Sequence, residues 1–538
     1  MAFDLVIRNG TVYDGSGGPP RLADVGVVED LVVVVGDVDP QAEVGVELDA
    51  GGMAVAPGFV NMLSHSYISI LQDARSLGEL TQGVTTQIFG EAFSMGPLTP
   101  EVRAQLLADQ RPLQFDVPWT TLSEYLAHVE KRGTSQNVAS FIGARTLRQI
   151  GAGFEDRPMS TAEMGHVKGL VADEMADGAL GIGSALIYPP SCFAPTGELI
   201  ELCSVAARYR GKYISHLRSE GNRFLEALDE FFTIADRAGL AAEVYHLKAA
   251  GRSNWPKMDA ALDAIEAAQA AGLAVTADVY TYTAGGTSLS ATIPPRFHEG
   301  GLPALGERLS DAATLQEIRD LIALPGDDWE NLYLASGGAD GVLVLTTSRD
   351  EVRPYQGKTI AEIAAIEGWD DPIEALVELV RRDNRIGAAY FIIDEDNLRK
   401  ALVKPWVSFG SDAASIPAEG AFLASATHPR SYGTFAKLLG QYVRDEKLVP
   451  LEEAVRRLSR LPADTLELDR RGRLEEGFFA DVVVFDPDTI GDRATYVEPH
   501  QYSVGVHHVV VNGVVELRDG QFTGAFGGRA LWGPGRRR

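Results

Sequence analysis

The chain is poor in the features that mark several classes of protein. It has only two cysteines in 538 residues, Cys192 and Cys203, which are too few for a disulfide framework. No apolar run approaches the ~20 residues that a membrane-spanning helix needs. The first residues, MAFDLVIRNGTVYDG, lack the charged start and apolar core of a secretory signal. We therefore expect a cytoplasmic protein that has no membrane partner.

Positive charge is also scarce. The chain has 48 Lys and Arg residues against 75 Asp and Glu residues, which gives a formal net charge of −27. Nucleic acids and anionic membranes attract surfaces rich in Lys and Arg, so neither is an expected partner. The composition, 45% hydrophobic and 23% charged, is typical of a globular protein with a large core. The length predicts two or three domains, and the oligomeric state stays open, a homo-oligomer included.

The two ends of the chain resemble each other. FDLVIRNGTVYDG and DLVVVVGDV near the N-terminus, and ADVVVFDPD and VHHVVVNGVVELRDG near the C-terminus, are short β-rich runs broken by Asn-Gly and Asp-Gly. This pattern predicts one small β-sandwich domain formed by residues 1–57 and 464–538.

The middle of the chain, residues 58–463, alternates short Val/Ile/Phe-rich segments with Ala/Leu/Glu-rich segments of helical period. Eight strand candidates follow in order: GFVNMLSH, VTTQIFGE, ASFIGAR, ALGIGSA, YISHLRS, AEVYHLK, AVTADVYTY and VSFGSDA. They predict an α/β fold, a TIM-like (β/α)8 barrel with its chemistry at the C-terminal ends of the strands. Residues 288–350 are too long for a loop and predict an insertion, either a lid or a passive decoration.

Polar residues lie at the C-terminal ends of five of these strand segments: His65, Glu91, His216, His246 and Asp412. Imidazoles and carboxylates that converge on one cavity are what a zinc ion needs, and a nearby carboxylate can then move protons. Asp412 is the candidate base. A lone strand-end histidine is more often an ordinary hydrogen-bonded residue than a ligand. Glu91 could instead pair with a cation such as Arg218.

In order along the chain, VAPGFV, GVTT, GALGIGSALIYPP, SHLRSEGN, YHLKAAG, DVYTYTAGGTS, FGSDA and HPRSYGTF resemble the amidohydrolase superfamily. Within it they are most similar to the N-acyl-D-amino-acid deacylases, or D-aminoacylases. The resemblance covers nearly the whole chain. It implies that His216 and His246 bind zinc and that Asp412 is catalytic. It also implies that Lys248 and Tyr280 hold the substrate carboxylate or the scissile carbonyl.

Two motifs of that family are altered in this chain. Its His-x-His on the first strand is replaced by Leu63-Ser64-His65, and its Asn-Cys-Gly on the second strand by Glu91-Ala92-Phe93. A serine of the family is replaced by Gly286. The family's cysteine serves the tight metal site, and zinc accepts a carboxylate in place of a thiolate. We therefore expect one zinc ion on Glu91, His216 and His246 and the loss of the second site.

The remaining candidates are substrate contacts. His65 is expected to line the pocket, and Lys248 and Arg430 can pair with a substrate carboxylate through charge-assisted bonds. The predicted activity is a zinc-dependent amide hydrolase that cleaves the C–N bond of an N-acyl amino acid or related acylated amine with metal-activated water. Two alternatives stay open: hydrolysis of another amide-like bond (dipeptide, cyclic imide or carbamate), or a metal-free inactive relative that only binds ligand.

Overall fold

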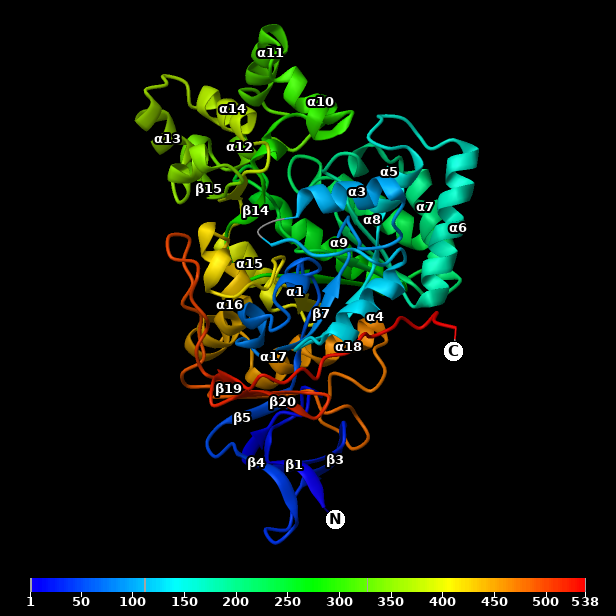
Figure 1. Ribbon diagram of the computed structural model, residues 1–538, viewed down its shortest axis with the longest axis vertical. Helices are drawn as coiled ribbons and strands as arrows, with labels where there is room; N and C mark the ends of the chain where they lie inside the picture. The colour runs from blue at the N-terminus through cyan, green and yellow to red at the C-terminus, as the bar shows by residue number, and fades with distance from the viewer. Residues whose placement is uncertain (1, 111–112, 327, 538) are drawn as a thin grey trace.

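The computed structural model describes residues 2–110, 113–326 and 328–537. Three parts follow one another along its longest axis (Figure 1). Strands from both chain ends lie at one end, a body of parallel strands and helices lies in the middle, and a segment around residues 285–390 lies at the other end. The predicted α/β class is confirmed.

The strands near the termini form one nine-stranded sheet within the described residues. They are β1 (Phe3–Val12), β2 (Arg21–Val28), β3 (Leu31–Gly36), β4 (Val44–Asp49), β5 (Ala54–Pro57), β18 (Val482–Phe485), β19 (Val506–Val511), β20 (Val514–Arg518) and β21 (Gln521–Phe522). The sheet curls, since Val32 at one edge donates its N–H to the Phe478 carbonyl at 2.9 Å. Alternating Val, Leu and Ile side chains fill the interior of this curl. The two chain ends, which were predicted to form a β-sandwich, thus share one curled sheet.

The Asn-Gly and Asp-Gly pairs near the C-terminus have the backbone that a hairpin turn requires. Asn512 and Gly513, between β19 and β20, have φ angles of 49° and 79°, and Asp519 and Gly520, between β20 and β21, have 50° and 73°. Both central residues of a type I′ turn have positive φ, a conformation that Asn, Asp and Gly tolerate. The Asn-Gly pair at residues 9–10 instead makes an irregularity within β1.

Parallel strands form the centre of the molecule. Two sheets contain them, β17-β13-β12-β11-β10-β9 and β6-β7-β8. The strands are β6 (Phe59–Asn61), β7 (Val84–Phe89), β8 (Asn137–Ser140), β9 (Ile142–Gly143), β10 (Gly181–Ala185), β11 (Lys212–His216), β12 (Ala242–Val244), β13 (Val275–Val279) and β17 (Val407–Phe409). Each of the eight predicted segments overlaps one of them, and ASFIGAR overlaps both β8 and β9. Since β8 and β9 are separated only by Phe141, they act as one interrupted strand.

Hydrogen bonds join the last parallel strand to the first. Met62 donates to the Phe409 carbonyl at 3.1 Å, and Asp412 donates to the Leu63 carbonyl at 2.9 Å. Ser64 and Ala413 form a further parallel bridge. These bonds support the prediction of a closed barrel, and they bring the segments that carry His65 and Asp412 together.

Helices follow the strands and pack around them. They are α1 (Ser69–Gln72), α2 (Leu77–Leu80), α3 (Pro100–Asp109), α4 (Leu122–Arg132), α5 (Ala144–Gly151), α6 (Thr161–Asp177), α7 (Thr196–Ala207), α8 (Phe224–Ala238), α9 (Met258–Ala270), α15 (Glu395–Leu402), α16 (Arg430–Lys437), α17 (Leu451–Leu458) and α18 (Arg460–Leu466). Local sequence sets their limits: α6 begins with a capping box between Ser160 and Glu163 and ends at Gly178 in the left-handed conformation. The boundary predicted between 463 and 464 falls within α18.

The chain between β13 and β17 builds a substructure of its own. It contains the antiparallel strands β14 (Gly285–Ser288), β16 (Gly387–Tyr390) and β15 (Val342–Thr346), and the helices α10 (Gly301–Arg308), α11 (Ala312–Ile322), α12 (Leu332–Ala335), α13 (Ile360–Glu367) and α14 (Pro372–Arg382). A separate apolar core holds it together. The predicted insertion, residues 288–350, is shorter than the observed one. The observed segment extends to residue 390 because β14 pairs with β16 about a hundred residues later. We call residues 285–390 the insertion.

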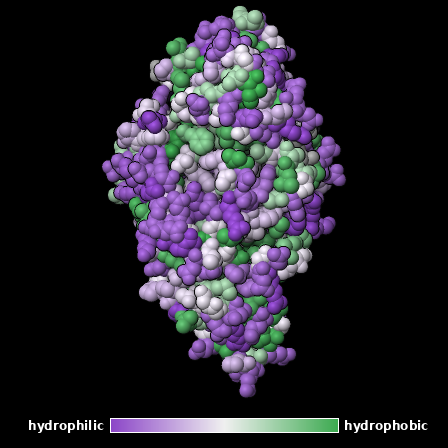
Figure 2. All heavy atoms as spheres, turned by 90° about the vertical axis from the view of Figure 1, so that its left-hand side faces the viewer, coloured by the Kyte–Doolittle hydropathy of each residue, from purple (hydrophilic) through white to green (hydrophobic). Residues whose placement is uncertain are grey.

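The face shown in Figure 2 is covered mainly by hydrophilic residues, with hydrophobic ones in small groups. Among the described residues, we find no helix with both the length and the apolar character needed to cross a bilayer.

Candidate metal centre and active site

The five strand-end residues singled out in the sequence meet in one cavity. His216 is the last residue of β11, and Glu91 and His246 come two residues after β7 and β12. Asp412 and His65 follow β17 and β6. All five line a cavity of about 530 Å³ that lies between the barrel and the insertion. The sequence therefore predicted correctly which side chains converge.

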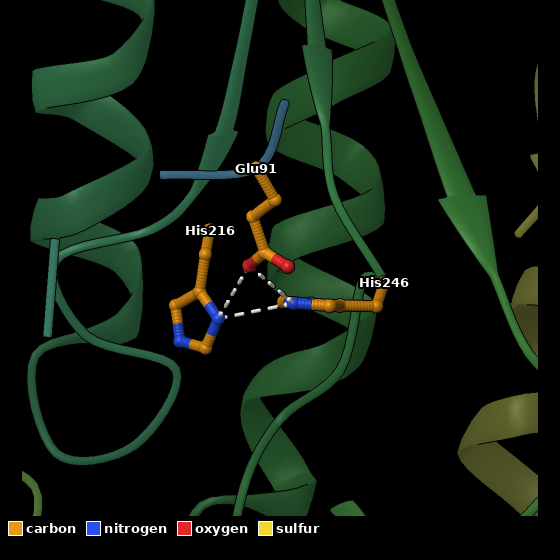
Figure 3. Close-up of side chains that lie close together, drawn as sticks. All are labelled: Glu91, His216 and His246. Carbon is orange, nitrogen blue, oxygen red and sulfur yellow. Dashed lines mark hydrogen bonds and ion pairs between the residues drawn. The ribbon is translucent and has the colours of Figure 1, made fainter. Parts of the chain in front are cut away.

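Glu91, His216 and His246 point their ligand atoms at one another (Figure 3). His216 Nδ1 lies 3.0 Å from His246 Nε2, and Glu91 Oε1 lies 3.5 Å and 3.4 Å from these two atoms. Atoms bound at about 2.0–2.1 Å to a tetrahedral zinc ion are ~3.4 Å apart, so this triangle matches a zinc ligand set in size. All three side chains are buried. The residues fit a cation of this kind.

The alternative partner for Glu91 is engaged elsewhere. Arg218 makes an ion pair with Glu230 at 2.7 Å and donates to the carbonyls of Cys192 and Ala194. Burial alone raises the pKa of Glu91, but hydrogen bonds from His216, His246 and His65 outweigh it and hold the pKa well below its usual range. Glu91 is therefore an ionised carboxylate whose contacts are imidazoles.

The backbone around the centre is strained. His246 and Asp412 have φ angles of 36° and 49°, and Ala92, next to Glu91, has 57°. Asp tolerates such a value, whereas Ala92 and His246 adopt theirs at a cost, and conformations of this kind persist where the surroundings enforce them. Asp278 supplies one constraint, because its Oδ1 accepts the His246 N–H at 3.0 Å. Strain of this kind is concentrated at functional sites.

His65 lies between two carboxylates. Its Nε2 is 3.0 Å from Glu91 Oε2 and 3.0 Å from Asp412 Oδ1. Burial by itself lowers the pKa of His65, but the hydrogen bonds with Asp412 and Glu91 outweigh it and raise the pKa to about 9. At neutral pH His65 is therefore a cation that links the candidate ligand Glu91 to the candidate base Asp412.

Arg430 lies behind Asp412. Its Nη1 donates to Asp412 Oδ2 at 2.6 Å and its Nη2 donates to the Gly286 carbonyl at 3.1 Å. Burial raises the pKa of Asp412, but the charges of Arg430 and His246 and the hydrogen bond with His65 together outweigh it, so the pKa stays below its usual value. A Cβ at position 286 would lie 3.1 Å from Arg430 Nη2, so glycine there makes room for this pair. Whereas Lys248 and Tyr280 line the cavity, Arg430 reaches it through Asp412.

The two residues proposed to hold substrate differ in what they already contact. Lys248 Nζ donates to Glu220 Oε1 at 2.6 Å and to the His246 carbonyl at 2.9 Å. The buried hydroxyl of Tyr280 makes no hydrogen bond within the described part of the chain. Burial raises the pKa of Tyr280, so the hydroxyl is neutral and can donate. A ligand in the cavity would give this hydroxyl its partner.

Sequence reasoning missed one carboxylate beneath the centre. Glu220, four residues after His216, lies 3.1 Å from His246 Nδ1 and 3.6 Å from His216 Nε2. The only signal was its position in SHLRSEGN, four residues from a predicted ligand. The sequence also did not predict which apolar residues cover the cavity; we call this cover, which includes residues of the insertion, the cavity roof. The apolar side chains of the cavity come from barrel loops and from the insertion: Tyr67, Phe93, Phe154, Ile187, Tyr188, Ile293, Leu302, Trp329, Leu332, Ile386 and Ile392.

The chain matches a family of known proteins and several of their structures. The amidohydrolase family model matches residues 46–515. The D-aminoacylase of Alcaligenes xylosoxydans xylosoxydans is 31% identical over 98% of this chain and 97% of its own, and the N-acyl-D-glutamate deacylase of the same organism is 34% identical over 95% and 93%. The crystal structure of N-acyl-D-glutamate deacylase from Bordetella bronchiseptica, complexed with zinc and a phosphonate inhibitor, superposes with a TM-score of 0.80 at 29% identity, covering 99% of this chain and 100% of that one.

Proposed function

The chain belongs to the amidohydrolase family, and on this basis we propose that it is a zinc-dependent deacylase that hydrolyses the amide bond of an N-acyl-D-amino acid. As its relatives do, it acts as a hydrolase on C–N bonds other than peptide bonds. The observation that carries the proposal is the triangle of Glu91 Oε1, His216 Nδ1 and His246 Nε2, with sides of 3.0–3.5 Å.

One ion rather than two is proposed. The position where the family has its first strand-one histidine holds Leu63, a buried apolar residue without a ligand atom. His65 Nε2 already bridges Glu91 and Asp412 as a protonated donor, 3.0 Å from each. A proton on His65 thus places one positive charge between the two carboxylates, at the position where a second cation would have to bind.

A zinc ion, when bound, supplies Lewis acidity that polarises the scissile carbonyl and makes water more acidic. The residues of the chain then handle the proton. Asp412, ionised because Arg430, His246 and His65 together hold its pKa low, accepts a proton through Oδ1 from the water whose oxygen bonds to the carbonyl carbon. As the C–N bond breaks, Asp412 returns that proton to the amine nitrogen. The products are a carboxylic acid and a free amine.

Tyr280 and Lys248 are proposed to orient the substrate. Among the described residues the Tyr280 hydroxyl is a buried donor without a partner, which suits a carbonyl or carboxylate oxygen. Lys248 carries a charge that Glu220 already balances, so it would contribute a directed hydrogen bond more than net attraction. Arg430 is proposed to add positive potential from behind Asp412. The relatives named for D-amino-acid substrates support the choice of substrate class.

The experiment combines metal analysis with a substrate panel. Purified protein is expected to contain about one zinc per chain, and chelation is expected to abolish hydrolysis of N-acyl-D-amino acids while readdition of zinc restores it. N-acyl-L-amino acids, fatty amides, dipeptides and hydantoins are tested in parallel. Hydrolysis of one of these classes in preference to N-acyl-D-amino acids would overturn the substrate assignment. Protein that holds no stoichiometric metal and hydrolyses none of them would be an inactive relative.

A further inference from the structure

We propose that Glu220 is a positioning residue of the metal centre, whose carboxylate sets the tautomers of His216 and His246, and that Glu330 of the insertion holds Glu220 in place. The inference rests on the proposed function, because it assigns the support of the same centre. Neither residue touches the reacting atoms in this scheme. Both act through the two imidazoles.

The outer nitrogens of both imidazoles face the Glu220 carboxylate. His246 Nδ1 lies 3.1 Å from Glu220 Oε1, and His216 Nε2 lies 3.6 Å from Glu220 Oε2. His216 Nε2 is buried and makes no hydrogen bond among the described residues, so the Glu220 carboxylate is the charged group that faces it. One carboxylate, buried and 3% exposed, thus serves both rings from the side opposite Glu91.

The chemistry of the donors decides which neighbour of His246 Nδ1 is its partner. An imidazole that binds a cation is neutral and carries one proton, so His246 Nε2 can offer its lone pair to the ion only if Nδ1 is protonated. Lys248 Nζ, 2.8 Å from Nδ1, is an ammonium and has no lone pair to accept that proton. Glu220 can accept it. By the same argument, the proton of a neutral His216 lies on Nε2, and Nδ1 is free to bind a cation.

Lys248 reinforces this arrangement. It donates to Glu220 Oε1 at 2.6 Å and to the His246 carbonyl at 2.9 Å, so it ties the carboxylate to the strand end that carries the ligand. Carboxylates that accept from metal-binding histidines fix the ring orientation and raise the basicity of the ligand. Their loss typically lowers metal affinity by about 10–100-fold.

The insertion holds the loop of Glu220 directly. Glu330 Oε1 accepts from Ser219 Oγ at 2.7 Å, from the Glu220 N–H at 2.5 Å and from the Gly221 N–H at 2.7 Å. The Glu220 carbonyl in turn accepts from the Ala250 N–H at 2.7 Å. The backbone at Glu220 is therefore fixed from both sides, and one of the two sides is the insertion. The insertion thus helps to build the centre as well as to cover it.

Metal binding without substrate provides the test. Zinc affinity is measured by competition with a chromophoric chelator, and the visible spectrum of the cobalt-loaded protein reports the geometry of the ligands. Glu220→Gln is expected to weaken zinc binding by about 10–100-fold and to alter the cobalt spectrum, because its amide can donate to His246 Nδ1 and so favour the wrong tautomer. Glu220→Asp, which keeps the acceptor, is expected to recover part of the affinity.

Glu330 offers a matched pair of variants. Glu330→Ala removes the acceptor of all three bonds and is expected to weaken zinc binding several-fold, whereas Glu330→Gln keeps a carbonyl oxygen in the same place and is expected to bind like the parent. Affinity and spectrum unchanged in Glu220→Gln would overturn the inference and leave the proposed function standing. If the parent protein itself binds no zinc, the proposed function fails and the inference fails with it.

Discussion

Arg430 and Asp412 form a buried ion pair in which only one carboxylate oxygen is engaged by the guanidinium. Arg430 Nη1 binds Oδ2 at 2.6 Å, and the other oxygen, Oδ1, lies 3.0 Å from His65 Nε2. Both residues are less than a tenth exposed. The pair keeps Asp412 ionised, yet leaves Oδ1 on the side of the cavity and of Glu91. A carboxylate held in this way can accept a proton from water without rotating.

Replacement of Asp412 by Asn tests its role in proton transfer. We expect kcat to fall by about 10²–10⁴-fold, because general acid–base catalysis contributes a factor of this size. Zinc content should remain that of the parent, since Asp412 is outside the proposed ligand set. Steady-state kinetics and metal analysis on the same preparation measure both. A variant with normal kcat would remove Asp412 from the mechanism.

Gly286→Ala tests the Arg430–Asp412 pair without changing either residue. The new Cβ would lie 3.1 Å from Arg430 Nη2, so the guanidinium must shift. With Arg430 displaced, the pKa of Asp412 is expected to rise, and the acidic limb of the kcat/KM profile should move to higher pH by up to about one unit. Gly306→Ala, in α10 where a new Cβ would meet no other part of the described chain within 4 Å, is the control and should leave the profile unchanged.

Part of the site could be predicted from the sequence because several of its residues stand at the ends of strands. His216 and His246 were predictable because the C-terminal ends of neighbouring parallel strands must lie side by side, a geometry that follows from the strand pattern alone. The position of Glu91 in the same cavity follows from its place two residues after β7, and its assignment as a ligand stays a prediction that rests on the neighbouring cysteine position of the family. These are local signals, each read within a few residues of a strand end.

Contacts between distant segments could not be predicted in the same way. The Glu330 contact with Ser219 and Gly221 joins positions about 110 residues apart, and β14 pairs with β16 across a similar distance. No periodicity in the sequence encodes such a pairing. The role of Glu220 was hidden for the same reason, because Glu220 lies in a loop after β11 whose backbone is held by Glu330 of the distant insertion. Tertiary packing, not local pattern, sets these contacts.

Glu91→Gln tests the carboxylate that replaces the family's cysteine. The amide is neutral and is a weaker ligand, so we expect zinc to be lost at substoichiometric chelator concentrations and activity to fall with it. Glu516→Gln is a suitable control, since burial raises the pKa of Glu516 in the terminal sheet to about 8 and its carboxyl is already neutral at pH 7. Retention of zinc by Glu91→Gln would show that another residue completes the ligand set.

The stability of the metal-free protein should depend on pH through His65. Its pKa is raised from 6.5 to about 9, so the stabilisation is complete below pH 6.5 and is lost as the pH rises through 9. The loss should be less than about 3 kcal/mol, because 30% of the side chain is exposed. Other buried acids also titrate in this range, so the measurement is the difference in unfolding free energy between parent and His65→Gln at pH 6.5 and pH 9. A difference that does not change with pH would contradict the expectation.

Because residues of the insertion line the cavity, replacing one of them should change the KM for substrate. Trp329 lines the cavity from the insertion, so Trp329→Ala should remove apolar contact area from a bound substrate. The contact is the same in the ground state and the transition state, so KM should rise by about tenfold for substrates with large apolar groups while kcat changes little. Substrates with a small acyl group and a small side chain should lose less, because they do not reach the roof. Leu22→Ala, at a side chain 78% exposed on the terminal sheet, is the control. An equal loss for small and large substrates would place Trp329 outside the binding surface and would assign the roof a structural role only.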